Sequence, residues 1–172
     1  MPPDGGEVSA GRITRHLLMP PWRVRRAFPA AALAAIEQAI RESERTHAGQ
    51  IRFAVEGALH GRRLYRGQSA RERALEVFSE LRMWDTDERN GVLIYLLLAD
   101  RAVEIVADRG AHLKVGSDEW REICRGMQTE LQAGHHEAAV LLAIHAVTRH
   151  LAAHFPPGAA PGRQLPDEPV VL

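Results

Sequence analysis

NGVLIYLLLADRAVEIVADRG, at residues 90–110, predicts two β-strands joined by a tight turn. The apolar run over residues 92–99 is unbroken, which is typical of a strand that is covered on both faces. After the polar pair Asp100-Arg101, apolar and polar residues alternate over residues 102–107. An antiparallel hairpin places the beginning of the first strand beside the end of the second. Polar residues that are far apart in the sequence are therefore expected to meet at one end of an apolar sheet.

A parallel β-α-β unit is predicted ahead of the hairpin. Apolar residues alternate with more polar ones over residues 51–56, which indicates a strand with one polar face. Ser69 and Glu72 then form an S-x-x-E capping box in front of an amphipathic helix. A right-handed crossover through this helix makes the 51–56 strand parallel to the 92–99 strand.

Further helices are expected before and after these strands. Pro29 suits the first turn of a helix that ends near His47. Ser117 is expected to cap a helix with a clear apolar stripe, and a last helix follows Gly134 and stops at Phe155. The predicted order is α-β-α-β-β-α-α. This order gives an α/β fold in which a small mixed β-sheet, a parallel β-α-β unit plus an antiparallel hairpin, is sandwiched between helices.

Composition limits the classes of protein to which the chain can belong. Its 172 residues, 45% hydrophobic and 26% charged, fit one soluble domain with tails. The net charge is zero, so no global field favours nucleic acid. The single cysteine, Cys124, excludes an internal disulfide, and its place on an apolar helix face predicts a buried thiol. No run approaches the ~20 apolar residues of a membrane span. We therefore expect a cytoplasmic location, with peripheral contact to the inner membrane as an option.

The expected domain covers residues 28–155. Residues 1–27 form a basic N-terminal arm with a short helix over residues 13–18, and residues 156–172 form a Pro- and Gly-rich tail that is expected to be disordered. Five arginines stand against two acidic residues in the arm, so it suits a membrane surface or an acidic partner. Packing of the arm on its own domain is the open alternative.

Oxygen-bearing side chains are expected to converge at the open end of the hairpin. Some precede its first strand, one follows its second strand, and two begin the next helix. The candidate metal ligands are Asp85, Asp87, Asn90, Asp108, Asp118 and Glu119. Clustered carboxylate and carbonyl oxygens bind hard cations such as calcium. The alternative for the last two is a role in the first helical turn, where acidic side chains offset the helix dipole.

Two other polar groupings have simpler explanations. Three arginines within residues 62–66 precede the capped helix and could grip an anion, but a solvated basic loop is favoured. His150 and His154 are four residues apart, yet no H-E-x-x-H motif or cysteine pair accompanies them, so surface histidines are favoured. The sequence has no P-loop, dinucleotide-binding glycine pattern or nucleophile elbow. No catalytic residue is assigned.

The hairpin and its flanks resemble the core signature of the TPM domain family. The matching stretches are NGVLIY at 90–95, Asp100-Arg101, VEIV at 103–106 and DRG at 108–110. The family takes its name from thylakoid-lumen, photosystem II repair and acetylcholine-receptor auxiliary proteins. The resemblance covers about residues 28–155, and the chain is similar to the short bacterial branch.

The resemblance implies a compact α/β/α sandwich. Some relatives bind calcium or another divalent cation at the sheet edge, which implies the same role for Asp85, Asp87, Asn90 and Asp108. A plant member is described as an acid phosphatase, and bacterial relatives are often found with LemA-type membrane proteins. The loop at 108–116 departs from the family, because it lacks the usual G-x-G-L-E pattern.

Three functions follow as hypotheses. The first is a non-catalytic binding or assembly module of a membrane-associated protein complex, with a LemA-type protein as partner and a divalent cation at the acidic sheet edge. The second is a metal-dependent acid phosphatase. The third is a peripheral membrane-surface protein that binds lipid through the basic arm at residues 1–27.

Overall fold

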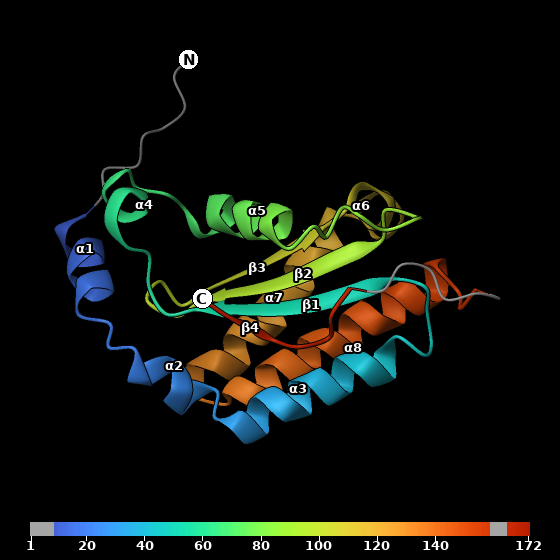
Figure 1. Ribbon diagram of the computed structural model, residues 1–172, viewed down its shortest axis with the longest axis horizontal. Coiled ribbons are helices and arrows are strands. Elements are labelled where there is room, and N and C mark those ends of the chain that lie inside the picture. The colour runs from blue at the N-terminus through green and yellow to red at the C-terminus, as the bar shows by residue number, and fades with distance from the viewer. Residues whose placement is uncertain (1–8, 159–164) are drawn as a thin grey trace, which may run out of the picture.

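The computed structural model describes residues 9–158 and 165–172. It confirms an α/β fold, in which helices lie on both faces of a four-stranded mixed sheet (Figure 1). In chain order the elements are α1 Ala10–Leu17, α2 Trp22–Ala27, α3 Ala30–Ser43, β1 Gln50–Glu56, α4 Gly61–Tyr65, α5 Ala70–Glu80, β2 Gly91–Leu97, β3 Ala102–Ala107, α6 Arg109–Val115, α7 Ser117–Gln132, α8 His136–His154 and β4 Val170–Val171.

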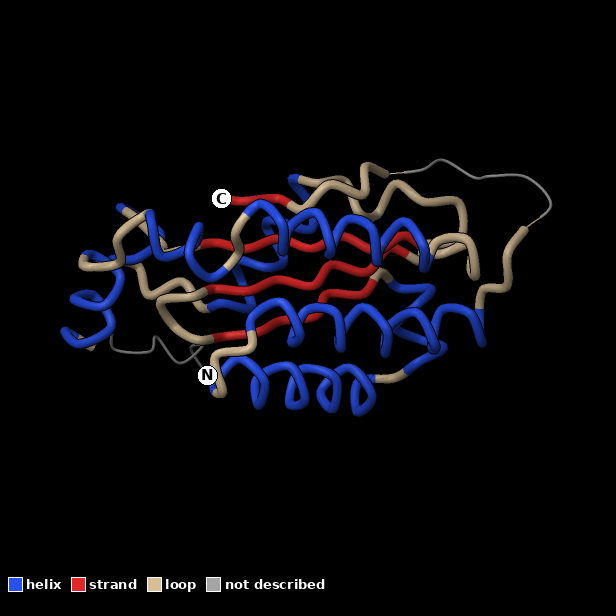
Figure 2. Tube along the Cα trace, turned by 90° about the horizontal axis from the view of Figure 1, so that it is seen from below, coloured by secondary structure: helices blue, strands red, loops and turns tan. Residues whose placement is uncertain are grey.

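The sheet has the strand order β3-β2-β1-β4. β1 runs parallel to β2, with Gln50 opposite Gly91, and β2 runs antiparallel to β3, with Val92 opposite Ala107. The predicted parallel pairing of the first two strands and the predicted hairpin are therefore confirmed. Figure 2 shows the strands side by side, with the longer helices running along them. Every residue of β1 and β2 is buried, because the two central strands are covered on both faces.

Side chains of the central strands alternate between two cores. Ile94 and Leu96 face the larger core, which α3, α7 and α8 cover. Leu93 and Tyr95 face a smaller core under α5. Alternation with a period of two residues thus assigns each side chain of β2 to one helical layer. None of the described helices is long and apolar enough to cross a lipid bilayer.

The two predicted serine caps had different outcomes. The capping box is confirmed, because Ser69 Oγ accepts a hydrogen bond from Glu72 N at 3.1 Å and the Glu72 carboxylate accepts one from Ser69 N at 2.7 Å. The expected cap at Ser117 is wrong, since this serine is the first residue of α7 and Gly116 occupies the cap position with a φ of 94°. Glycine tolerates this left-handed conformation, which turns the chain sharply from α6 into α7.

Short helices fill segments that were expected to be loops. α4 lies in the segment after β1, and α6 occupies most of the predicted loop at 108–116. Helices of five and seven residues are too short to show a helical period in the sequence. The helix that begins after Pro29 ends at Ser43, four residues before the expected end at His47.

The N-terminal arm packs on the domain from residue 9 onward. It contains α1, which overlaps the predicted 13–18 helix, and α2. Val24 of α2 is buried in the larger core, beside Phe28. Residues 1–8 lie outside the described part of the chain.

The prediction that residues 156–172 are disordered is wrong for residues 165–172. β4 pairs in parallel with β1, and Leu172 N donates to Val55 O at 2.9 Å. Leu165 N also donates to Gln50 Oε1 at 2.7 Å. The physical reason is that β1 would otherwise be an open edge, and two residues suffice to extend its ladder. Residues 159–164 are not among the described residues.

Candidate functional site

The hairpin brings Asn90 and Asp108 together, as its register requires. β2 begins directly after Asn90 and β3 ends directly before Asp108. Asp108 N donates to Gly91 O at 2.8 Å, which extends the ladder by one step beyond the strands. These two residues and the 83–90 loop form what we call the acidic edge.

Two buried oxygen atoms at the acidic edge lack a hydrogen-bond partner. Asn90 is 2% exposed, and its amide nitrogen Nδ2 donates to Ala48 O at 3.1 Å. Asp108 caps α6 through Oδ1, which accepts from Arg109 N at 2.7 Å. Asn90 Oδ1 and Asp108 Oδ2 have no partner among the described residues. Such orphaned acceptors are uncommon in folded proteins, and each one calls for an explanation.

Two glycines allow the backbone to pack closely at this edge. A Cβ atom at Gly110 would lie 2.3 Å from Glu88 O, and one at Gly91 would lie 2.2 Å from Met83 O. Neither position has room for a side chain, because backbone atoms cannot move aside cheaply. The glycines of the N-G and D-R-G stretches therefore hold the 83–90 loop against the ends of β2 and β3.

The other predicted ligands lie in different surroundings. Asp85 is partly buried and Asp87 is exposed, both in the 83–90 loop. Asp118 forms an ion pair with Arg121, and the Glu119 carboxylate lies 3.7 Å from His150 Nε2. Within residues 9–158 and 165–172, no three His, Cys, Asp or Glu side chains cluster closely enough to hold a metal ion.

The opposite end of the sheet contains a saturated polar network centred on Asp100. Arg12 donates to its carboxylate through Nη2 at 2.7 Å and Nε at 3.0 Å, and His16 Nε2 lies 2.9 Å from Oδ1. His16 is fully buried and its Nδ1 accepts from Leu59 N at 2.8 Å, so Nε2 carries the proton that is donated to Asp100. Burial opposes ionisation of Asp100, but the Arg12 and His16 hydrogen bonds outweigh it and lower the pKa of Asp100.

A second network ties α5 to the central strands. Glu56 Oε2 accepts from Arg73 Nε and from the Tyr95 hydroxyl, both at 2.8 Å. Burial and the Glu56 charge raise the pKa of Tyr95 above its ordinary value. Sequence reasoning assigned no partners to these groups. The one signal was Glu56, an acidic residue in a strand whose other face is apolar.

One end of the molecule combines exposed apolar side chains with arginines. Helices α1, α2 and α4 lie together at this end, at the left of Figure 1. We call it the α1–α2–α4 end. Its large apolar side chains are exposed by 57%, 74%, 55% and 60% at Leu17, Leu18, Trp22 and Tyr65.

The segments that form the α1–α2–α4 end contribute basic side chains and no acidic ones. Residues 9–28 and 57–68 contain five and three arginines, respectively, and no aspartate or glutamate. Asp100 and Glu76 neutralise part of this charge through Arg12, Arg15 and Arg63. The remaining arginines form no ion pair within the described part of the chain; they are Arg23, Arg25, Arg26, Arg62 and Arg66.

Comparison with known proteins identifies the family. A family model described as the TPM domain matches residues 25–150. The chain belongs to the TPM domain family. This TPM domain is similar in structure to the BA42 protein of the psychrophilic bacterium Bizionia argentinensis, solved by NMR, with 28% sequence identity and a TM-score of 0.74. The similarity covers 84% of this chain and 95% of the BA42 chain. No curated protein sequence matches the chain.

The family model covers the acidic edge of this TPM domain but only part of the opposite end. The acidic edge and the Glu56 network lie within residues 25–150, whereas α1 and β4 lie outside them. Arg12 and His16 therefore come from a segment that the family model does not match. The α1–α2–α4 end is built partly from the family domain and partly from that segment.

Proposed function

We propose that this TPM domain is a non-catalytic assembly module that binds an anionic membrane surface through its α1–α2–α4 end. The observation that carries the proposal is the exposure of two leucines, a tryptophan and a tyrosine among arginines that have no ion-pair partner in residues 9–158 and 165–172. Apolar and aromatic side chains insert at the level of the lipid headgroups, while arginines attract anionic lipids. The family resemblance implies a LemA-type membrane protein as partner, and a domain bound to the membrane surface would lie beside such a protein.

The fold supports this role by presenting the apolar and basic groups together. Asp100 fixes α1 through Arg12 and His16, so the exposed leucines at its C-terminal end occupy a defined place. Each arginine near an anionic surface contributes roughly 1 kcal/mol to binding. Several such contributions act together because the side chains share one end of the molecule.

Vesicle sedimentation tests the membrane proposal. We expect the protein to bind phosphatidylcholine vesicles only when they contain phosphatidylserine, and added salt should weaken the binding. Leu18→Ser and Arg23→Glu should each reduce it severalfold. Leu113→Ser and Arg45→Glu are the matched controls, since both are exposed elsewhere on the molecule, and they should leave binding unchanged. Equal binding by all four variants would refute the proposal.

A divalent cation at the acidic edge is a second proposed function. The orphaned oxygens Asn90 Oδ1 and Asp108 Oδ2 favour it, because calcium prefers carboxylate and amide oxygens. Asn90 and Asp108 would hold the ion, whereas Asp85 and Asp87 do not cluster with Asp108 and would add their carboxylates only after a movement of the 83–90 loop. When bound, the ion would bridge this loop to the start of α6.

Calorimetric titration of calcium, magnesium and zinc into the metal-free protein tests the cation site. Asp108→Asn keeps the oxygen that caps α6 but removes the charge, so it should abolish binding. Asp118→Asn is the control, because Asp118 is 88% exposed and paired with Arg121. Binding that survives Asp108→Asn, or that Asp118→Asn weakens as much, would place the ion elsewhere.

A phosphatase assay separates the assembly module from the enzyme hypothesis. We expect any hydrolysis of p-nitrophenyl phosphate in the presence of calcium to persist when Asp85, Asp87 and Asp108 are all changed to asparagine, which would identify a contaminant. Loss of hydrolysis in this triple variant would instead show a metal-dependent phosphatase that uses the acidic edge.

A further inference from the structure

Residues 165–172, which we call the β4 tail, run along the outer edge of β1 (Figure 1). Leu165 N donates to Gln50 Oε1 at the start of the strand, and Leu172 N donates to Val55 O near its end. The tail lies outside residues 25–150, which the family model matches. Without it, β1 would be an edge strand whose outer backbone groups are open to another strand.

The β4 tail forms a short ladder with β1. Val170 and Val171 pair with this strand, which is seven residues long. Pro169 comes directly before the ladder, and its fixed φ and missing N–H do not suit a continuous strand. Val171 and Leu172 are exposed by 50% and 43%. Among the described residues, most of the outer edge of β1 is therefore covered without strand pairing.

The buried side chain of Arg52 is incompletely paired beside the tail. It is 8% exposed, and its Nη2 donates to the main-chain oxygen of Glu168 at 3.2 Å. Its Nε has no hydrogen-bond partner, and its guanidinium forms no ion pair, within residues 9–158 and 165–172. A buried guanidinium is best paired with a carboxylate, which can accept two parallel hydrogen bonds. The tail offers a carbonyl oxygen instead, while the Glu168 side chain is exposed to solvent.

The tail also brings two carboxyl groups together. Burial and the neighbouring Asp167 raise the pKa of Glu44, the residue that follows α3. Arg41 Nε lies 3.5 Å from Asp167 Oδ2 and offsets part of the repulsion. An uncharged side chain in the place of Asp167 would remove the repulsion altogether.

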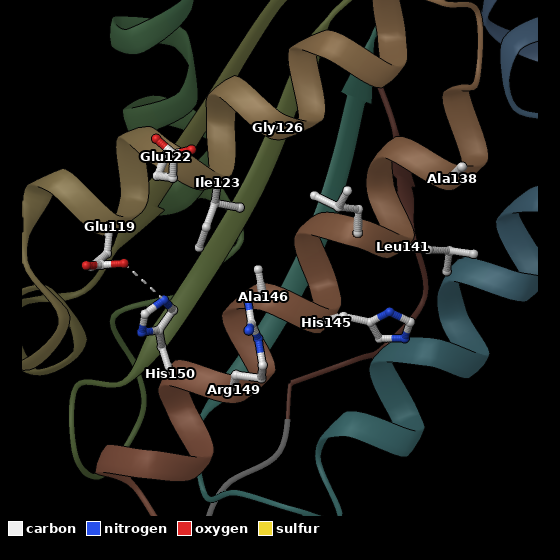
Figure 3. Close-up of a pocket in the computed structure, with 11 residues that line it drawn as sticks. Glu119, Glu122, Ile123, Gly126, Ala138, Leu141, His145, Ala146, Arg149 and His150 are labelled. Atoms are coloured by element: carbon white, nitrogen blue, oxygen red, sulfur yellow. Dashed lines mark ion pairs between the residues drawn. The ribbon is translucent and has the colours of Figure 1, made fainter.

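The groove between α7 and α8 differs from the β1 edge in this respect (Figure 3). It has a volume of about 690 Å³, and two glutamates line it. Glu119 lies 3.7 Å from His150 Nε2, and Glu122 pairs with Arg125. The carboxylates of the groove are thus paired within the chain. Arg52, by contrast, is a buried charge without an ionic partner among the described residues.

We propose that the outer edge of β1 is a docking site for an extended, acidic segment of a partner protein, and that the β4 tail is its intramolecular competitor. The segment adds to β1 as a parallel strand, so that main-chain hydrogen bonds supply affinity and side chains supply specificity. β4 shows that the edge accepts a parallel strand. A segment without a proline in its ladder pairs with more of β1 than β4 does. The inference does not rest on membrane or cation binding.

The register of β4 defines the side chains that the segment needs. Val170 lies opposite Ala54, so position 168 falls opposite Arg52 and on the same face of the sheet. In a regular strand, a glutamate at that position can pair with the guanidinium. Position 167 lies beside Glu44 and favours an uncharged side chain. Position 170 packs on the smaller core and favours a β-branched residue.

The same contacts favour a different protein over a second copy of this chain. The tail of a second copy carries the same Asp167 and Pro169, so it would reproduce the repulsion and the interrupted strand. A segment of another protein can relieve both and can also supply a carboxylate to Arg52. Exchange of tails between two copies is therefore the competing outcome that the experiment must separate.

Fluorescence anisotropy with the full chain tests the docking site. The probe is a labelled peptide that copies residues 165–172 with Asp167→Asn and Pro169→Thr. We expect Val170→Asp protein to bind it about tenfold more tightly than the wild type, because a charge placed against the smaller core releases the competing tail. Val171→Asp is the matched control, since Val171 is exposed, and this protein should bind the peptide as the wild type does.

Changes in the peptide test recognition without altering the protein. Glu168→Gln in the peptide should weaken binding about fivefold, because it removes the carboxylate that pairs with Arg52. An aspartate kept at position 167 should weaken it too, and Val170→Asp in the peptide should abolish it. Full binding by the Glu168→Gln peptide or by the Val170→Asp peptide would overturn the inference.

A folding check and a mass measurement complete the test. Circular dichroism must show that Val170→Asp protein keeps its helix content, and the peptide series can also be run on the wild-type protein alone. Absence of peptide binding to both proteins would overturn the inference. In sedimentation velocity, a wild-type dimer that Val170→Asp dissolves would identify the tail of a second copy as the occupant and would also overturn it.

Discussion

The Asp100 network and the acidic edge, which lie at opposite ends of the sheet, differ in how completely their own polar groups are paired. At the α1–α2–α4 end, Asp100 accepts from Arg12 and His16, and His16 accepts in turn from Leu59 N. At the acidic edge, Asn90 and Asp108 each use one polar atom in the fold and leave one buried oxygen without a partner among the described residues. A saturated network indicates a structural role. Spare buried acceptors indicate a place where a ligand would complete the pairing.

The strongest test of this contrast removes the centre of the saturated network. Asp100→Ala leaves the Arg12 guanidinium and the buried His16 ring without their acceptor, so we expect a loss of about 3 kcal/mol in the free energy of unfolding. Urea unfolding measures the loss. Asp118→Ala, which removes an exposed carboxylate, should leave the unfolding midpoint unchanged. Similar midpoints for the two variants would show that Asp100 does not hold α1 in place.

A glycine substitution tests the close packing of the acidic edge. Gly110→Ala places a Cβ atom 2.3 Å from Glu88 O, so the 83–90 loop must shift, and we expect a loss of about 2 kcal/mol. Gly11→Ala is the matched control, because nothing lies within 4 Å of its Cβ position and alanine favours the helix. In thermal unfolding, Gly110→Ala should lower the melting temperature and Gly11→Ala should raise it. An unchanged melting temperature for Gly110→Ala would argue against the close approach.

A smaller effect is expected from the second network. Tyr95→Phe removes one hydrogen bond to Glu56 while Arg73 still pairs with that carboxylate. The loss should be about 1.5 kcal/mol, as for a hydrogen bond to a charged group. Tyr65→Phe, at an exposed site, should have no measurable effect on the same unfolding curves. A loss near that of Asp100→Ala would mean that the two networks act as one unit.

The last prediction concerns the pH dependence of stability and Glu44, which lies near Asp167 in the segment before β4. Burial and the neighbouring Asp167 raise the pKa of Glu44 to about 8 from 4.5. The folded state therefore binds more protons than the unfolded state between these two pKa values, and stability should fall as pH rises from about 5 to about 8. Glu44→Gln should flatten this slope in urea unfolding at several pH values. An identical slope in the variant would exclude Glu44 as its source.

Sequence patterns predicted the parts of the fold that repeat over several residues. The hairpin, the parallel crossover and the long helices follow from periods of 2 and 3.6 residues, and the adjacency of Asn90 and Asp108 follows from the hairpin register. β4, α4 and α6 are too short to show a period. The partners of Asp100 could not be predicted, because Arg12 lies 88 residues away and no local pattern links the two.

The candidate cation site was likewise only partly predictable from the sequence. Asp118 and Glu119 were grouped with the acidic edge because they follow it closely in sequence. The Asp118–Arg121 ion pair lies within α7, between residues three positions apart, whereas the Glu119–His150 pair depends on the packing of α7 against α8, which the sequence does not specify. Whether they also contribute to a cation site stays a prediction.

Helix α8 acts as a spacer between the two ends. Near its start, the His136 ring lies 5.9 Å from the Phe28 ring beside α2, and just past its end Phe155 O accepts from Ala48 N beside Asn90. Its 19 residues span about 28 Å, more than three Debye lengths at physiological ionic strength. Charge changes at one end are therefore screened from the other. A domain anchored by its basic end would hold its acidic edge well clear of the lipid headgroups, within reach of a partner above the bilayer.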